Sequence, residues 1–295
     1  MSLYDMDGHL ITKPSKGRLI PVNYAALSGS LVTASEPDHD DFLIENIINP
    51  DPDLVFQTDQ QSLQITLVLQ RLQSLNAVGI SNHSLSYDGE IQVDFYENDT
   101  LVLSIKQAAH QPLYEWGDSP GWEMMKWGGY PLDGDPESII WPYIDVFVDG
   151  ALLVNKVVID LTDNHPITVG HLFAGSAFSP GFNFDWGQSL TVDHPSNVTD
   201  SPGGITLVSP EPPKRTLNIR WLYLTRGEMG RINNILRVAR RDNHPIYFNA
   251  YPSWGRQTEQ QGVVLAYPIS WTPPAERTNN MGEFELIARE VASAE

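Results

Sequence analysis

The feature of this sequence that most constrains its fold is an alternation of apolar and polar residues along short segments. Two such segments begin near residues 64 and 90, and their apolar side chains fall on every second position. These positions are Ile65, Leu67, Leu69, Ile91, Val93 and Phe95. Because side chains along a strand point alternately to opposite faces of a sheet, this period indicates strands with one buried face. The chain is therefore predicted to be built mainly from antiparallel sheets.

Residues typical of turns separate these segments. An Asp-Gly pair at 88–89 suits a tight hairpin, and an Asn-Asp pair at 98–99 turns the chain into a third strand, which together predict an antiparallel meander. A second Asp-Gly pair at 149–150 predicts another hairpin, between strands at 144–148 and 151–154. Short strands at this spacing, with Gly, Pro and Asp between them, favour a sandwich or jelly roll.

The pattern changes in the last third of the chain. A stretch dense in Pro, Gly, Ser and Asp at 179–214 predicts a long connection or insertion. Thr225 and Glu228 then match a capping box, in which their side chains satisfy exposed amides at a helix start, and apolar residues follow at helical spacing. The predicted helix covers 228–241. Strands are predicted on either side of it, at 217–223, 246–249, 263–269 and 284–288.

These segments together predict a mainly β protein with two β-sandwich or jelly-roll modules, the second with a single α-helix packed on its sheet. A length of 295 residues suits about two domains of about 150 residues each. The predicted division is an N-terminal arm at 1–41, a jelly-roll module at 42–178 and a second β-module at 179–295. The jelly-roll module carries an aromatic-rich insertion at 114–143.

Charge is distributed unevenly along the chain, whose net charge is −19. Residues 1–213 carry 7 Lys and Arg against 29 Asp and Glu, whereas residues 214–241 carry 8 basic residues and one acid. A chain this acidic repels polyanions, so specific nucleic-acid binding is not expected. The basic segment coincides with the predicted helix and the strand before it.

Several classes of function are disfavoured by composition. The chain has no cysteine, which excludes disulfides, thiol catalysis and Cys-ligated zinc. No apolar run approaches the roughly 20 residues of a membrane span, and acids stand at the start where a secretory signal has basic residues. We therefore expect a protein without membrane insertion, made and assembled in the cytoplasm.

No catalytic, cofactor-binding or metal-binding residue is predicted. Common phosphate-loop, dinucleotide, metalloprotease and hydrolase motifs are absent, and the eight histidines are scattered along the chain. Acidic loops at 36–41 and 133–137 could supply oxygen ligands to calcium, but neither matches an EF-hand loop, and such loops are usually solvated. Polysaccharide hydrolysis needs two carboxylates across a sugar, and nothing singles out a pair.

Two groups of residues are candidate interface residues. The first lies in the aromatic-rich insertion, where large rings could anchor a partner or stack on sugars, or could pack a small core of their own. Its members are Trp116, Trp122, Trp127 and Tyr130. The second lies on the predicted helix and just before it, where guanidinium groups could pair with carboxylates of a neighbouring subunit or form a plain solvated face. Its members are Arg226, Arg231, Arg237, Arg240 and Arg241.

Three stretches carry a resemblance to a known family. The run Val-Gly-Ile-Ser-Asn-His-Ser-Leu-Ser-Tyr-Asp-Gly at 78–89 resembles a segment of discoidin-like, galactose-binding-like jelly rolls in siphophage tail proteins. The run Ile-Thr-Val-Gly-His-Leu-Phe-Ala-Gly-Ser-Ala-Phe at 167–178 is similar to a strand of the same group. The strand, helix and closing strands over 217–288 resemble the tail-tube or distal-tail fold.

The resemblance implies a non-enzymatic virion protein at the distal end of a long tail, forming a ring, commonly a hexamer. Its partners would be the tail tube, the hub and other tail-tip proteins. The alternative is a carbohydrate-binding module that recognises host surface glycan, and a second alternative is a polysaccharide hydrolase. Self-association would favour the ring, and glycan binding would favour the module.

Overall fold

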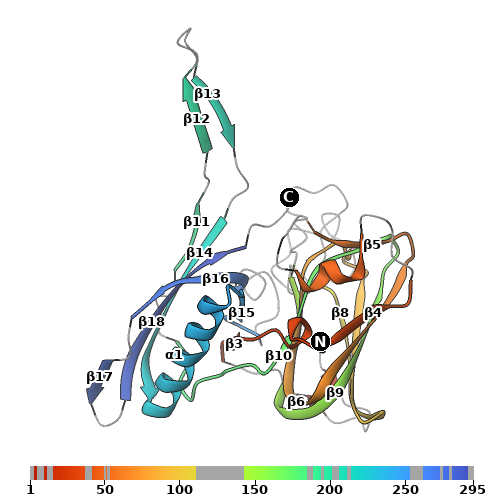
Figure 1. Cartoon of the computed structure of the whole chain (residues 1–295), viewed down its shortest axis with the longest axis horizontal. Coiled ribbons are helices and arrows are strands. Elements are labelled where there is room, and N and C mark those ends of the chain that lie inside the picture. Colours follow the sequence, from red (N-terminus) through yellow and green to blue (C-terminus); the bar gives the residue numbers. More distant parts are fainter. Residues whose placement is uncertain are drawn as a thin grey trace, which may run out of the picture.

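The computed structural model describes residues 3–4, 10–11, 16–36, 42–49, 51, 54–110, 143–184, 189–193, 196–200, 206–210, 214–252, 262–272, 275–278 and 281–291. Two seven-stranded antiparallel sheets dominate this part of the chain, and one α-helix lies on the second sheet (Figure 1). The predicted fold class, a mainly β protein with one helix near its C-terminus, is confirmed.

The first sheet contains strands from the middle of the sequence. They are β4 (Leu31–Ala34), β5 (Phe56–Thr58), β6 (Ser62–His83), β7 (Glu90–Glu97), β8 (Thr100–Ala108), β9 (Tyr143–Thr162) and β10 (Ile167–Gly175). Their order is β5-β10-β6-β9-β7-β8, with β4 also paired to β6. Strands β6 and β9 pair along most of their length, and the sheet bends along them so that its two ends face each other (Figure 1). Apolar side chains from both ends form one core.

The turn at residues 98–99 forms as predicted, but two other predicted hairpins do not. Asn98 and Asp99 have φ angles of 47° and 69°, as a two-residue turn of type I′ requires, and join β7 to β8. Residues 88–89 do make a turn, yet β9 lies between β6 and β7, so no hairpin follows and the predicted meander is wrong. Long-range pairing with β9 decided this order.

The predicted hairpin at residues 149–150 is also wrong. Strand β9 runs through these residues, and its pairing with β6 jumps from Phe147, opposite Ala77, to Leu152, opposite Leu75. Gly150 has a φ of +93°. The glycine therefore allows an irregular bulge within a long strand rather than a turn between two strands.

The second sheet contains the last third of the chain and one strand from near the start. Its strands are β3 (Arg18–Ile20), β11 (Ser189–Asp193), β14 (Lys214–Thr225), β15 (Ile246–Asn249), β16 (Val263–Trp271), β17 (Ala275–Thr278) and β18 (Met281–Glu290). The order is β11-β14-β18-β16-β15-β3, with β17 paired to β18. Of the predicted N-terminal arm, β3 thus joins the second sheet and β4 the first. Short elements β1 (Leu3–Tyr4), β2 (Leu10–Ile11), η1 (Tyr24–Ala26) and η2 (Ile44–Ile48) complete the N-terminal region.

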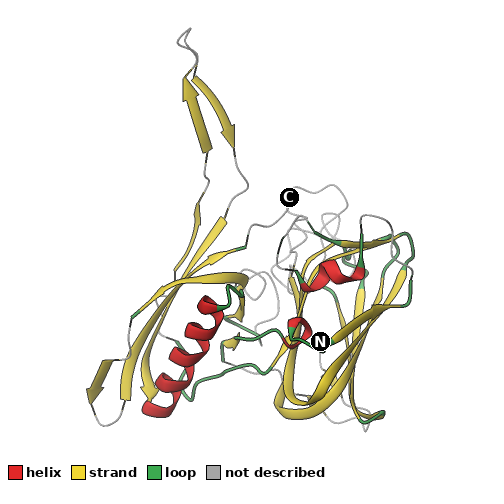
Figure 2. Cartoon of the chain, viewed as in Figure 1, coloured by secondary structure: helices red, strands yellow, loops and turns green. Residues whose placement is uncertain are grey.

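Helix α1 (Arg226–Arg241) covers one face of the second sheet (Figure 2). The predicted capping box is present: the Thr225 hydroxyl accepts a hydrogen bond from the Glu228 amide, and the Glu228 carboxylate accepts one from the Thr225 amide. The apolar stripe of α1 is buried against the sheet at Met229, Ile232, Leu236 and Ala239. The predicted helix is confirmed, and it begins two residues earlier than expected.

A two-stranded ribbon occupies much of the stretch that was predicted to be a connection. It consists of β11 paired with the start of β14, followed outward by β12 (Ser196–Asp200) paired with β13 (Thr206–Pro210). Among the described strands, β12 and β13 pair only with each other. This ribbon projects away from both modules (Figure 1).

The two modules share a small apolar core of their own. Phe173 of the first module contacts Tyr247 of the second, with ring centroids 5.9 Å apart. Gly79 lies against the same tyrosine, and a Cβ at this position would come within 2.8 Å of the ring. The absence of a side chain at Gly79 therefore lets β6 approach the second sheet closely.

Candidate functional site

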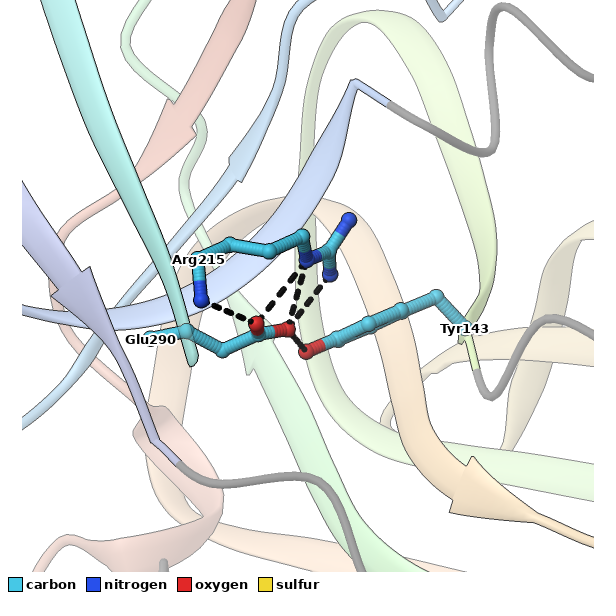
Figure 3. Close-up of polar contacts among 3 residues, drawn as sticks. All are labelled: Tyr143, Arg215 and Glu290. Atoms are coloured by element: carbon cyan, nitrogen blue, oxygen red, sulfur yellow. Dashed lines mark hydrogen bonds and ion pairs between the residues drawn. The ribbon is translucent and has the colours of Figure 1, made fainter. Parts of the chain in front are cut away.

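A buried polar cluster joins the two modules at their interface (Figure 3). Glu290 of β18 accepts a hydrogen bond from the Tyr143 hydroxyl of β9 at 2.7 Å. The Nε of Arg215, on β14, lies 2.9 Å from both carboxylate oxygens of Glu290, and the Arg215 amide donates to the same carboxylate at 3.0 Å. Tyr143, Arg215 and Glu290 are all buried.

The electrostatics of this cluster suit a structural role. Burial, followed by the negative charge of Glu290, raises the pKa of Tyr143, so this hydroxyl stays protonated and donates. Burial alone would lower the pKa of Arg215, but the hydrogen bonds to Glu290 outweigh it and raise the pKa. The carboxylate thus has several donors around it, which fixes β9 of the first module against β14 and β18 of the second.

A second carboxylate strengthens the same junction. Asp145 of β9 accepts hydrogen bonds from the Tyr247 hydroxyl at 3.0 Å and from the Asn249 side chain at 2.8 Å, both on β15. Sequence reasoning missed both clusters because their members lie up to 147 positions apart in the chain. No local pattern brings such residues together.

The exposed face of α1 carries the five predicted arginines, and the structure gives them different surroundings. Arg241 makes two hydrogen bonds to Asp242, at 2.6 and 2.8 Å. Arg240 donates to the Ile269 carbonyl at 3.0 Å and lies over the ring of Trp271, 5.7 Å from its centroid. Arg231 lies over the Phe178 ring in a similar way. The arginines are therefore not one uniform patch.

Three of the arginines line one open hollow of about 500 Å³ at the C-terminal half of α1. Its lining residues are Asn234, Arg237, Val238, Arg240, Arg241 and Trp271. Arg226 and Arg231 lie outside it. This hollow, hereafter the arginine hollow, combines guanidinium groups with an aromatic ring, which suits carboxylates on a partner. Trp271 was not predicted, because nothing in its strand indicates that the helix end packs beside it.

The other predicted interface residues, Trp116, Trp122, Trp127 and Tyr130, lie outside the described residues. The same holds for the acidic loop at 133–137 and for most of the loop at 36–41. Within the described ranges, no three His, Asp or Glu side chains gather as metal ligands would. Helix α1 is charged and short, and the described part of the chain has no helix long and apolar enough to cross a membrane.

A third group of polar and aromatic side chains lies at one end of the first module. The ring centroid of His110 is 5.4 Å from that of His83 and 5.1 Å from that of Tyr87. His110 Nε2 lies 2.7 Å from the Leu85 carbonyl oxygen. Burial lowers the pKa of His83 to about 3 and also lowers that of His110, so both rings are neutral at pH 7. Sequence reasoning treated these histidines as scattered.

The fold is that of a two-module β protein with a jelly-roll-like first module. We compared the chain with known proteins. No family model matches the chain, and no curated protein matches it. The chain is similar to a GH29 fucosidase of Ruminococcus gnavus in complex with fucose, with 12% identity and a TM-score of 0.37. That match covers 53% of this chain and 27% of the fucosidase, so this chain spans about a quarter of that enzyme.

Two further likenesses are to isolated modules from Clostridium perfringens. One is the family 32 carbohydrate-binding module of NanJ in complex with galactose, at 9% identity and a TM-score of 0.36, covering 54% of this chain and 99% of the module. The other is a family 32 module in complex with GalNAc-β-1,3-galactose, at 12% identity and a TM-score of 0.33. That match covers 50% of this chain and 95% of the module. At such identities and scores, these likenesses assign no ligand to this chain.

Proposed function

We propose that this protein is a structural subunit that assembles with copies of itself, in the ring or adaptor role that the resemblance to distal tail proteins implies. In that role it is assembled in the host cytoplasm, resides in the virion tail, contacts the tail tube and hub, and performs no catalytic step. The observation that carries the proposal is the projecting ribbon.

The ribbon is difficult to explain in an isolated molecule. A two-stranded hairpin alone is at best marginally stable in water, because it buries too little apolar surface to offset the entropy of ordering its backbone. Strands β12 and β13 pair with no other described strand. A second subunit packed against the ribbon would stabilise it.

The rest of the molecule suits the same role. The buried carboxylates Glu290 and Asp145 hold the two modules together. The arginine hollow and the ribbon are two separate surfaces of the second module. A subunit with more than one contact surface can join several neighbours, as a ring or adaptor protein does.

Shortening the ribbon tests the proposal. Asp193 and Lys214 are directly opposite each other in the ladder of β11 and β14, so residues 194–213 can be replaced by Asn-Gly, the favoured two-residue hairpin turn. We expect the shortened protein to fold with an unchanged melting temperature but to stay monomeric in sedimentation velocity, whereas the full chain self-associates as its concentration rises. A full chain that stays monomeric, or a shortened chain that still associates, would contradict the proposal.

The second candidate function is carbohydrate binding by the first module. It is favoured by the partly exposed Tyr87 beside His110 at one end of the module, since an aromatic ring next to polar groups can stack on and orient a sugar. A glycan array that includes galactose-terminated glycans tests it. Binding that is lost in Tyr87→Ala and kept in Tyr96→Ala, a tyrosine on β7, would favour this function. No binding by the unmodified protein would exclude it.

A further inference from the structure

We propose that the arginine hollow of one copy receives the acidic turn between β7 and β8 of a second copy. This inference rests on the proposed self-assembly and identifies one of its contacts. The turn, hereafter the acidic tip, consists of residues 97–100 and carries the carboxylates of Glu97 and Asp99.

The hollow has positive charge that its surroundings leave uncompensated. Of its three arginines, Arg241 is paired with Asp242, and Arg240 is held by a carbonyl and by Trp271. Within the described part of the chain, no hydrogen bond or ion pair is found for the exposed side chain of Arg237. Beside it, Val238 is exposed. A carboxylate on a small protruding element would complement this charge and cover the apolar surface next to it.

The acidic tip has the shape and charge for this role. Its four residues are all exposed, and the side chain of Asp99 is 90% exposed and forms a surface ion pair with Lys156 at 3.7 Å. The two-residue turn is held by its backbone geometry and by a hydrogen bond from the Asn98 amide to the Asn155 side chain at 2.9 Å. It is therefore an exposed turn with an ordered backbone and two carboxylates, and this backbone loses little entropy on docking.

Other acidic turns of the first module fit less well. The carboxylate of Asp149 is paired with Arg18 at 3.0 Å. That of Asp163 accepts hydrogen bonds from the amide and hydroxyl of Ser86. The exposed turns at residues 59–61 and 87–88 carry one carboxylate each. Among these described turns of the first module, the acidic tip thus carries the most carboxylates.

The two surfaces lie on different modules of the chain, with the tip on the first and the hollow on the second. Contact between them is head to tail, and repetition of such a contact closes into a ring or extends as a filament. Because both surfaces are exposed to solvent, salt should weaken their attraction.

Charge reversal with rescue tests the contact in the full-length protein. Arg237→Glu and Asp99→Arg should each weaken self-association about tenfold in sedimentation equilibrium at low salt, and the double variant should recover most of the loss, because the reversed charges attract again. The matched control is Arg289→Glu with Asp59→Arg, which reverses two other exposed charges and should leave the association constant within about threefold.

Three outcomes would overturn the inference: single variants that associate as strongly as the unmodified protein, a double variant that associates no better than the single variants, or control variants that weaken association equally. The ribbon deletion separates this failure from failure of the proposed function. If the deletion abolishes association while reversal at Arg237 and Asp99 has no effect, the assembly proposal stands and this contact is wrong.

Discussion

Removing the charge of Glu290 should destabilise the protein far more than removing the charge of Glu283, a less buried glutamate on the same strand. In Glu290→Gln the side chain keeps its shape, but Arg215 stays buried without its counter-ion. Breaking a buried pair in this way costs about 3 to 5 kcal/mol of the free energy of unfolding, because the remaining charge has lost its hydration and is no longer stabilised by a counter-ion. Since whole domains are stable by only about 5 to 15 kcal/mol, the loss is a large share of the total.

The chain supplies a matched control. Arg220 and Glu283 form an ion pair between the same two strands, β14 and β18, but the Arg220 side chain is 45% exposed, whereas that of Arg215 is 11% exposed. Glu283→Gln should therefore lower the free energy of unfolding by no more than about 1 kcal/mol. The two variants differ in burial and not in the chemistry of the substitution.

Urea unfolding followed by tryptophan fluorescence measures the loss in free energy of unfolding for Glu290→Gln and for Glu283→Gln. This loss is obtained from the shift in the midpoint urea concentration, provided that the denaturant slope (m-value) is unchanged. Tyr143→Phe adds an intermediate case, because it removes one hydrogen bond to a charged acceptor, worth about 2 kcal/mol. Equal losses in Glu290→Gln and Glu283→Gln would refute the reasoning that burial makes this junction strong.

Two further predictions follow from buried groups in the first module. Burial lowers the pKa of His83 to about 3, below the ordinary 6.5. Between these two pH values the unfolded chain binds a proton that the folded chain does not. The free energy of unfolding should therefore fall as the pH drops below about 6.5 and continue to fall toward pH 3. Melting temperatures across this range should depend less on pH in His83→Gln than in the exposed His165→Gln. Gly79→Ala should destabilise by about 1 to 3 kcal/mol, because its Cβ would come within 2.8 Å of the Tyr247 ring. Gly230→Ala, at a helix position with open space around it, should instead raise the free energy of unfolding by up to about 1 kcal/mol. Calorimetry measures the change for both glycine variants.

Local patterns in the sequence determined the elements whose signals depend on near neighbours. The period-two segments became strands, the turn at residues 98–99 formed, and α1 began at the capping box of Thr225 and Glu228. Such features depend on interactions among a few adjacent residues, so the local sequence is enough to predict them. Arg231, Arg237 and Arg241 lie on the exposed side of α1 for the same reason, since the apolar stripe of α1 fixes which side is buried.

Pairing between distant segments was decided only by the tertiary structure. The Asp-Gly pair at 149–150 has the same local preference as a hairpin turn, yet β9 continues through it because β6 offers a long partner on one side. The ribbon of β11 to β14 arose from a stretch whose composition indicated a connection. The cluster of Tyr143, Arg215 and Glu290, and the hollow completed by Trp271, join residues that are far apart in the chain. Their positions follow from how two sheets pack, which depends on the burial of the whole core and not on any short pattern.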